Sequence, residues 1–420
     1  MFIIRLALRS LFNRRLTTTL TLLSVALSVG LLIGVERVRL GARDSFTNTI
    51  SQTDLIVGAK GGTIQLLLYA VFRMGSATNN ISYTVYEKIK NNPDVAWTIP
   101  YSLGDSHKGF RVVGTSSDFY EHYHYRHNGG IEFAEGRMPQ GLFDVTLGSM
   151  VADRLGYKLG DRIILQHGIG DVSFQNHADK PFTVTGILKQ TGTPIDRSVY
   201  ISLEAITAIH IDWKDGAPPR TGEETKAADL IGKKLEVHQI TAFLLAAKSR
   251  MDTLRLQRMI NDYDDEPLMA IIPGVALSEL WDGISYAEDG LRVVSAFVVI
   301  VGLLGMLVSI YNSLNERRRE MAILRSVGAG PNVIFSLMIL ESILMTVGGS
   351  IIGVAFMYAL LALLQPVIET HFGLYLPIHA PSLEEYIYLA AILVLGLLLG
   401  FVPAWRAYRN TLHDGLTIRV

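Results

Sequence analysis

The sequence predicts an α-helical membrane protein with four transmembrane helices and a large mixed α/β extracytoplasmic domain inserted between helices 1 and 2. Three observations lead to this fold class. Four apolar runs are long enough for helices that cross a bilayer, which need about 20 residues each. A long polar stretch separates the first of these runs from the second. The 420-residue chain is 49% hydrophobic but only 18% charged, which is unusual for a soluble protein.

The predicted spans are Leu16–Val35, Val293–Tyr311, a long run within Ile334–Leu364, and Tyr386–Trp405. We interpret the first as a retained anchor rather than a signal peptide, because its apolar run is too long and no small-residue cleavage site follows it. Residues Phe2–Asn13 precede it and carry Arg5 and Arg9 one helical turn apart. They form either a short interfacial helix or an extension of the first span, and the pattern leaves both open.

The distribution of arginine and lysine predicts the orientation of the chain, because cytoplasmic loops are enriched in both. Four arginines and no acid precede the first span, four arginines lie between the second and third spans, and the C-terminal tail carries three. The loop Gln365–Glu385 has neither arginine nor lysine. We therefore expect both termini in the cytoplasm and the large domain on the other side of the membrane.

The predicted domains are residues 1–39 with the first span, residues 40–290 outside the membrane, and residues 291–420 with the other three spans. Four short β-rich runs in the outer domain are flanked by Gly, Asp and Pro: KGFRVVGT, DRIILQH, KPFTVTGIL and RSVYISL. Two segments have helical patterns, SYTVYEKIKNN and AKSRMDTLRLQRMINDY. This mixture indicates an α/β domain.

A highly charged segment, Glu316–Pro331 (ERRREMAILRSVGAGP), lies between the second and third spans. Charges at the bilayer centre cost roughly 2.5–3.5 kcal/mol each, so the segment must leave the membrane on the cytoplasmic side. Apolar side chains at helical spacing form a small ridge within it: Met321, Leu324, Ile323 and Val327. Gly328 ends the predicted helix. Residues 316–328 suit docking in a groove of a cytoplasmic partner, and a solvated loop is the alternative.

Small residues four apart occur in three spans and allow helix backbones to approach closely in lipid. The strongest case is Gly348, Gly349 and Gly353, for which we expect tight packing. Glu341 lies one or two turns into the third span, where an acid is costly and by default functional. An interfacial Glu341 bonded to a neighbouring arginine is an equally good interpretation.

Several function classes are excluded by the sequence. The chain has no cysteine, which rules out disulfides, zinc–thiolate sites and cysteine nucleophiles. Its net charge of −1 argues against nucleic acid as a partner. Gly58–Gly62 (GAKGG) is not a P-loop, which needs GxxxxGK followed by Ser or Thr. With no nucleophile elbow or metalloprotease helix either, we expect no enzyme and no nucleotide bound by this chain.

Histidines are concentrated outside the membrane, where ten of the eleven are expected. The run DFYEHYHYRHNGG holds His122, His124 and His127 close to Glu121. Imidazole and carboxylate suit zinc, and a chain without cysteine has to use them. No tight ligand motif accompanies these residues. Exposed histidines interleaved with tyrosines are therefore the alternative, and zinc stays an open candidate.

The charged segment also carries a family resemblance. NERRREMAILRSVGAGP closely resembles the signature after the second span in permeases of the macrolide-exporter, lipoprotein-release and FtsX-like (type VII, mechanotransmission) ABC transporters. The runs VVGTSSDFY, VTLGSMVADRLGYKLGDRIIL and FTVTGILKQTGTPIDRSVYIS are similar to the family's periplasmic core. LESILMTVGGSIIG is similar to its third span.

This resemblance implies a permease in a bacterial inner membrane, with a porter-like part and an inserted lobe in its periplasmic domain. ATP and Mg would be bound by a separate cytoplasmic ABC ATPase dimer. A second permease copy or a paralogue, membrane lipids and a periplasmic protein are the other implied partners. The residues implied to seat on the ATPase are Glu316, Arg317, Arg318, Arg319, Glu320, Met321, Ala322, Leu324, Arg325 and Gly328. The family often has an acid at the place of Glu341.

Three functions remain open at the level of sequence. The first is a permease that transmits ATP-driven motion to a hydrophobic or envelope-associated substrate, such as a lipoprotein, peptide or amphiphile. The second is a metal (zinc)-related ABC transport system, favoured by the histidines. The third is a signalling module that transports nothing and activates a periplasmic partner.

Overall fold

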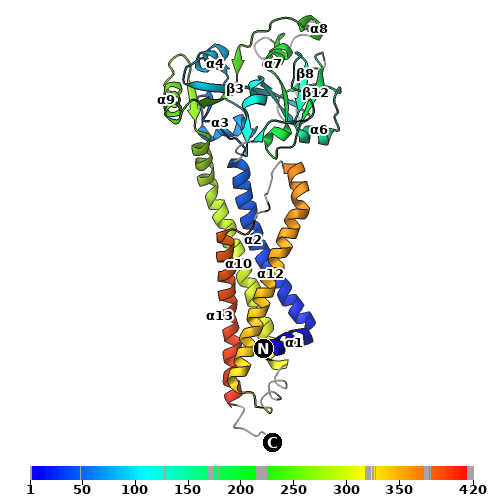
Figure 1. Ribbon diagram of the computed structural model, residues 1–420, viewed down its shortest axis with the longest axis vertical. Helices are drawn as coiled ribbons and strands as arrows, with labels where there is room; N and C mark the ends of the chain where they lie inside the picture. The colour runs from blue at the N-terminus through cyan, green and yellow to red at the C-terminus, as the bar shows by residue number, and fades with distance from the viewer. Residues whose placement is uncertain are drawn as a thin grey trace. The chain divides into compact units, whose positions relative to one another are not determined.

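The computed structural model describes residues 2–47, 49–126, 129–168, 175–177, 179–213, 225–316, 323, 326, 328–372, 378 and 380–413. The chain divides into two compact units (Figure 1). The membrane unit comprises residues 1–41, 285–366 and 376–420, and the outer domain comprises residues 42–284 with the short segment 367–375.

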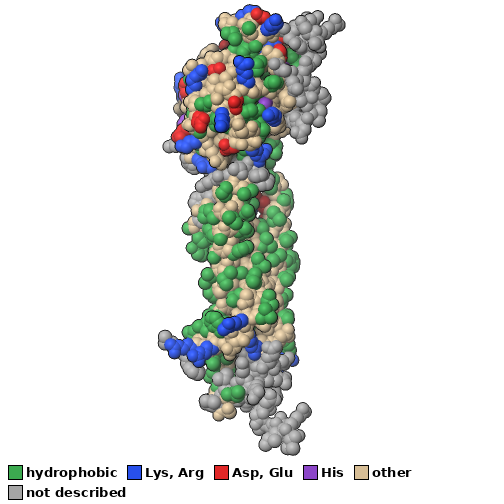
Figure 2. Space-filling model, turned by 90° about the vertical axis from the view of Figure 1, so that its right-hand side faces the viewer, with side chains coloured by type: hydrophobic (Ala, Val, Ile, Leu, Met, Phe, Trp, Pro, Cys, Tyr) green, Lys and Arg blue, Asp and Glu red, His purple; other side chains and the backbone are tan. Residues whose placement is uncertain are grey.

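The membrane unit is built from five helices among the described residues. They are α1 (Phe2–Asn13), α2 (Arg15–Thr47), α10 (Pro273–Glu316), α12 (Pro331–Phe372) and α13 (Leu383–His413). The last four are long and apolar enough to cross a membrane. On the face seen in Figure 2, hydrophobic side chains cover the helical unit over much of its length. The predicted fold class, four transmembrane helices with an α/β domain inserted between the first two, is confirmed.

Helix α1 is separate from the first span, because the backbone turns at Arg14. The hydroxyl of Thr18 donates to the Leu11 carbonyl at 2.9 Å and so satisfies one of the groups left open where α1 ends. Ala7 of α1 is fully buried in an apolar cluster with residues of α12 and α13, including Ile334 and Ala404. This packing makes α1 a helix in its own right rather than an extension of α2.

The outer domain contains sixteen strands and eight short helices among the described residues. The strands are β1 (Leu55–Ala59), β2 (Ile81–Ser82), β3 (Val95–His107), β4 (Phe110–Thr115), β5 (His124–Tyr125), β6 (Gly129–Gly130), β7 (Phe133–Gly136), β8 (Asp144–Leu147), β9 (Arg162–Ile163), β10 (Gln166–His167), β11 (Gln175–Asn176), β12 (Phe182–Leu188), β13 (Ser198–Ser202), β14 (Gln239–Ile240), β15 (Ala242–Ala247) and β16 (Leu268–Ile271). The helices are α3 (Thr63–Ala70), α4 (Tyr83–Lys90), α5 (Asp118–His122), α6 (Ser149–Leu155), η1 (Pro194–Arg197), α7 (Leu203–His210), α8 (Ala227–Leu230) and α9 (Arg250–Asn261).

One long strand, β3, joins the two halves of the main sheet, whose order is β16-β1-β15-β3-β4-β13-β8-β12-β7. Its first half pairs antiparallel with β15, from Val95 opposite Ala247 to Tyr101 opposite Ala242. Its second half pairs with β4, and the register shifts by a bulge after Leu103. Such a bulge bends a strand and increases its twist. The same strand therefore serves two separately packed cores.

Each half of the sheet has its own apolar core. Helices α4 and α9 bury Tyr86 and Leu256 against the half with β1, β15 and β16. Helices α6 and α7 bury Val151 and Ala205 against the half with β8, β12 and β13. A third cluster holds most of α3, so the apolar stretch after GAKGG is largely core.

A buried carboxylate organises the loop before β13. Asp196 is 2% exposed and accepts bonds from the backbone N–H groups of Thr191 (2.9 Å) and Gly192 (2.7 Å), and from the Thr191 hydroxyl (2.8 Å). Removing the carboxylate would leave buried N–H and O–H donors without an acceptor, at a place that water cannot reach.

We expect Asp196→Ala to lower the free energy of unfolding of the outer domain by about 3 kcal/mol, since each buried donor left without an acceptor costs about 1–3 kcal/mol. Thermal unfolding of the purified chain measures this loss. Asp262→Ala is the matched control, because that side chain is 71% exposed and its ion pair with Arg258 is worth little. Equal unfolding midpoints for the two variants would contradict the role given to Asp196.

Candidate functional sites

The third span packs against the first through small residues. A methyl group added at Gly353 of α12 would overlap the backbone carbonyl of Ala26 in α2, and one added at Gly349 would come within 2.6 Å of Val25 Cγ1. Gly348 is less tightly packed, with a Leu22 methyl carbon 3.2 Å from the same position. The α2 and α12 backbones therefore approach each other as closely as glycine permits.

The third and fourth spans pack through a similar contact. The Ser342 hydroxyl donates to the Gly396 carbonyl at 2.8 Å, and methyl groups added at Gly396 or Gly400 would overlap Thr346 or Ser342. Glu341, next to Ser342, is only 3% exposed and has an interaction partner within the protein. The predicted functional role of Glu341 stays a prediction, with its carboxylate placed inside the helical unit.

Charged residues join four helices of the membrane unit at one level. Arg39 of α2 lies 2.5 Å from Glu36 and 3.4 Å from both Glu288 of α10 and Glu384 of α13. Arg37 lies 2.6 Å from Glu385, whose side chain is 1% exposed, and stacks over the Tyr358 ring of α12 at 5.0 Å. Charges this well buried are costly unless paired, and each of these arginines lies close to a carboxylate of another helix.

The predicted ATPase-seating segment lies mostly outside the described residues. Arg317, Arg318, Arg319, Glu320, Met321, Ala322, Leu324 and Arg325 are among those not described. Helix α10 ends at Glu316, and Ile323 and Ser326 have helical backbone. Gly328 has φ +97°, the left-handed conformation that glycine adopts after a helix. The docking role of this segment stays a prediction.

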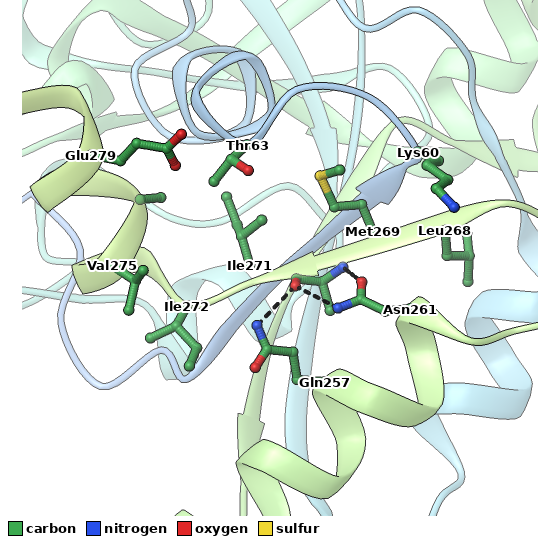
Figure 3. A pocket seen from close by; sticks show the side chains of 12 residues that line it. Lys60, Thr63, Gln257, Asn261, Leu268, Met269, Ile271, Ile272, Val275 and Glu279 are labelled. Atoms are coloured by element: carbon green, nitrogen blue, oxygen red, sulfur yellow. Dashed lines mark hydrogen bonds between the residues drawn. The ribbon is translucent and has the colours of Figure 1, made fainter. Parts of the chain in front are cut away.

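The outer domain contains a cavity of about 530 Å³ between α9, β16 and the start of α10 (Figure 3). Its lining is mainly apolar, including Met269, Ile272 and Val275, with Lys60 and Glu279 as charged members. Gln257 and Asn261 also line it, but their side-chain amides are bonded to the backbone of Ala270. A cavity of this size and composition suits an amphiphilic group.

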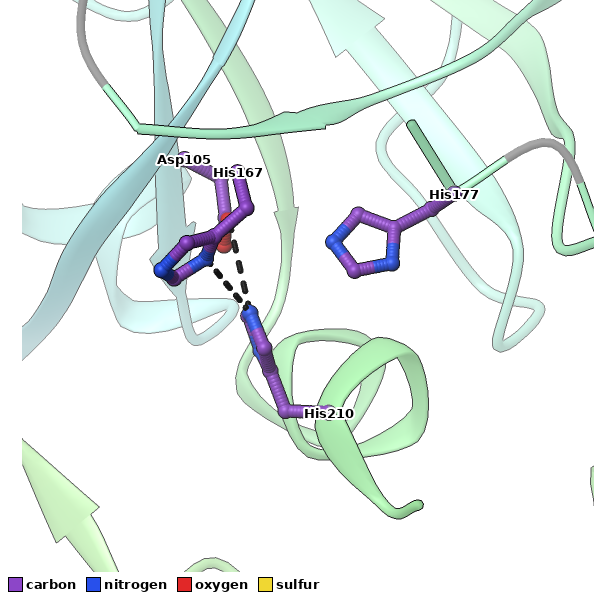
Figure 4. A group of neighbouring side chains, drawn as sticks. All are labelled: Asp105, His167, His177 and His210. Atoms are coloured by element: carbon purple, nitrogen blue, oxygen red, sulfur yellow. Dashed lines mark hydrogen bonds and ion pairs between the residues drawn. The ribbon is translucent and has the colours of Figure 1, made fainter. Parts of the chain in front are cut away.

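Four side chains from separate segments converge in the other half of the outer domain (Figure 4). Asp105 lies on β3, His167 on β10, His177 just after β11 and His210 at the end of α7. One ligand-type atom from each lies within 4.8 Å of all the others, and no other such group of three or more occurs among the residues that the structure describes. His167 Nδ1 is 3.0 Å from Asp105 Oδ1 and 3.1 Å from His210 Nε2.

The cluster has unusual protonation equilibria. Burial opposes ionisation of Asp105, but its interactions with His167 and His210 outweigh burial and lower the pKa of Asp105 to about 2. Burial lowers the pKa of His177 to about 4 despite the nearby Asp105 charge. At neutral pH, Asp105 is therefore ionised and His177 is neutral with a free lone pair on one ring nitrogen.

The histidines singled out in the sequence lie elsewhere. His122 ends α5 and stacks on Trp97 at 5.5 Å, and His124 begins β5 with its Nδ1 2.8 Å from the His122 carbonyl. His127 lies outside the described residues. Their predicted zinc binding stays a prediction. The Asp105 cluster was missed because its members are far apart in sequence, and no local spacing signals it.

Two models of known protein families together match most of the chain. The family model described as MacB-like periplasmic core domain matches residues 18–238, and that described as FtsX-like permease C-terminal matches residues 292–412. No curated protein matches the chain significantly.

Two solved structures are similar to part of the chain. One is the periplasmic region of MacB from Actinobacillus actinomycetemcomitans, 9% identical with a TM-score of 0.33, covering 55% of this chain and 94% of that one. The other is the extracellular domain of the noncanonic ABC-type transporter YknZ from Gram-positive bacteria, 12% identical with a TM-score of 0.30, covering 52% of this chain and 98% of that one.

Proposed function

This chain belongs to the family of FtsX-like ABC transporter permeases with a MacB-like periplasmic core domain, and from that premise we propose how it works. It transmits motion from a cytoplasmic ABC ATPase to its outer domain. That domain acts on a hydrophobic or envelope-associated substrate, such as a lipoprotein, peptide or amphiphile, at the periplasmic face of the inner membrane.

The continuity of α2 and α10 carries this proposal. Each helix runs without a break from the membrane unit into the outer domain, with the boundary at Gly41 in α2 and at Ile284 in α10. At 1.5 Å per residue, α2 is about 50 Å long and α10 about 66 Å, whereas the hydrocarbon core is about 30 Å thick. A tilt imposed at one end of such a helix displaces its other end, so the two helices are suited to act as levers.

The cavity beside α10 supports an amphiphilic substrate. Val275 and Glu279 belong to the first turns of α10 and also line the cavity. Movement of α10 therefore changes the shape of a largely apolar space in the outer domain. The largely apolar lining favours an amphiphile as the class of substrate.

The partners and the orientation follow from the family and the charge pattern. ATP and Mg are bound by a separate ATPase dimer, seated at residues 316–328. Two permease copies, or one copy and a paralogue, complete the complex, and a periplasmic protein is a further partner. Both termini are cytoplasmic, in agreement with the arginines that flank the spans.

The lever mechanism is tested by breaking the helices. Insertion of Gly-Pro-Gly after Gly41 or after Ile284 should interrupt α2 or α10 at the unit boundary. We expect the complex with its ATPase to retain ATP hydrolysis. Trapping it with ADP and vanadate should, however, no longer change the rate at which trypsin cleaves the outer domain.

The same insertion after Gly232 is the matched control. Gly232 lies in a turn with φ +84°, outside both helices, so the nucleotide-dependent change in cleavage should persist there. If the insertions in α2 and α10 also leave this change intact, these helices do not carry the motion.

A further inference from the structure

We propose that Asp105, His167, His177 and His210 bind a divalent transition-metal ion in the outer domain, with zinc as the best-fitting ion. This site is distinct from the one proposed for transport, because none of its residues lines the cavity or belongs to α2 or α10.

The spacing of the four residues suits tetrahedral coordination. Zinc binds imidazole nitrogen and carboxylate oxygen at about 2.0–2.2 Å, which places neighbouring ligand atoms about 3.3–3.5 Å apart. The distances among His167 Nδ1, His210 Nε2 and Asp105 Oδ1 are 3.0, 3.1 and 3.4 Å. His177 completes the group with all four ligand atoms within 4.8 Å, so a short movement of its ring closes the site.

Contacts among the described residues account for the other three side chains but leave His177 unexplained. A single proton on His167 Nδ1 can serve both Asp105 and His210, so those three are satisfied without an ion. His177 Nε2, however, is buried and has no hydrogen-bond partner among the described residues, in a side chain that is 4% exposed. Figure 4 shows its ring turned toward the other three side chains. A buried ring nitrogen without a partner is costly, and in the tautomer that carries its proton on Nδ1, Nε2 can bind a metal ion.

The surrounding structure orients the ligands as metal sites require. His210 Nδ1 lies 2.9 Å from the Ile206 carbonyl, which can only accept, so the proton is on Nδ1 and Nε2 offers its lone pair to the site. His167 and Asp105 are directly opposite each other in the antiparallel pairing of β10 with β3. Asp105 is 2% exposed, whereas the His167 side chain is 37% exposed and leaves a route for the ion.

The local charge favours a divalent cation. Lys180 pairs with Asp179 at 2.6 Å and with Asp212 at 3.2 Å, and both Asp105 and Asp179 act electrostatically on His177. The carboxylates of Asp105, Asp179 and Asp212 thus outnumber the single ammonium of Lys180, which favours a cation at this place. Imidazole-rich sites select zinc, copper or nickel over magnesium and calcium, which prefer all-oxygen ligands.

The 420-residue chain, purified in detergent and stripped of metal with a chelator, tests the proposal. Incubation with zinc, desalting and elemental analysis should give one zinc per chain. His167→Gln, whose side chain is partly exposed, and Asp105→Asn should each weaken zinc binding by at least about 100-fold, since even outer partners of metal ligands contribute 10–100-fold. His122→Ala and His124→Ala are the matched histidine controls and should keep the bound zinc.

The fluorescence of Trp213 provides a second measurement, which shows whether zinc binds at this cluster. Its ring lies 4.5 Å from that of His167, 5.9 Å from His177 and 5.2 Å from His210. Zinc should change the tryptophan fluorescence of the wild type, and Trp213→Phe should abolish that change while retaining zinc. Cobalt should give the visible absorption bands of a tetrahedral site.

Two results would overturn the proposal. One is a wild-type chain that retains no zinc. The other is zinc retained equally by wild type, His167→Gln and Asp105→Asn. Equal unfolding midpoints of the metal-free proteins ensure that lost binding reflects the ligands rather than misfolding.

Discussion

A chain carrying Met321→Asp and Leu324→Asp is expected to insert into the membrane but to lose binding of its cytoplasmic ATPase. The two side chains lie three residues apart on the predicted apolar ridge of segment 316–328, on one face of a helix. A carboxylate forced into an apolar groove is desolvated without a partner. Truncating a central interface residue commonly costs 2 kcal/mol or more, so two such losses correspond to roughly 1,000-fold weaker binding.

Co-purification of the ATPase and the ATP hydrolysis rate of the complex measure this effect. Ser326→Asp is the control, because it adds a carboxylate to the same segment outside the ridge, at an exposed side chain. Undiminished ATPase binding by the double variant would falsify the docking assignment. Equal loss in both would show that added charge, rather than the ridge, is responsible.

Gly353→Val should disrupt the packing of the first span against the third. The new side chain would meet the Ala26 carbonyl, part of a backbone that cannot yield as a flexible side chain can. Overpacking typically lowers the free energy of unfolding by about 1–3 kcal/mol. Because the neighbour here is rigid backbone, we expect a loss at or above the upper end of this range. Without an apolar driving force between helices in lipid, close contacts of this kind hold the bundle together.

Thermal unfolding and protease resistance of the purified chain measure this change. Gly290→Val is the matched control, because Gly290 is also a helical glycine of the membrane unit and has no atom within 4 Å of its added carbon. Equal stability of Gly353→Val and Gly290→Val would contradict the importance of the α2–α12 contact.

The sequence predicts the four spans well but not their full lengths. Hydropathy places the first span at Leu16–Val35 and the second at Val293–Tyr311, whereas α2 continues to Thr47 and α10 begins at Pro273. The parts of α2 and α10 beyond the predicted spans carry Glu36, Arg39 and Glu288. Because these residues are charged, a search for apolar runs ends each span before it reaches them. Ion pairs between helices stabilise them in the helical state, and such pairs are set by tertiary packing.

The strands of the outer domain were predictable where they are short and bounded by turn residues. The runs FRVVGT, FTVTGIL and SVYIS became β4, β12 and β13. The long strand β3 was not predicted, since its bulge and its two partners depend on chain segments distant in sequence.

The site formed by Asp105, His167, His177 and His210 could not be predicted from the sequence either, because its residues are far apart in the chain. His122, His124 and His127 draw attention because they are neighbours in sequence, yet His122 and His124 lie in different elements. Asp105 and His167 come together only through the pairing of β10 with β3, and His210 only through the placement of α7. No periodicity in one sequence encodes these long-range contacts.

We propose that the nucleotide state of the ATPase moves the outer domain relative to the membrane helices. The chain has no cysteine, so spin labels can be attached to Met251→Cys on α9 and Ile387→Cys on α13, which are 77% and 57% exposed. Double electron–electron resonance spectroscopy in lipid nanodiscs then measures the distance between the two labels. An excess of unlabelled copies ensures that both labels belong to one chain. We expect this distance distribution to shift between the nucleotide-free and vanadate-trapped complexes, and identical distributions in both states would contradict the proposed motion.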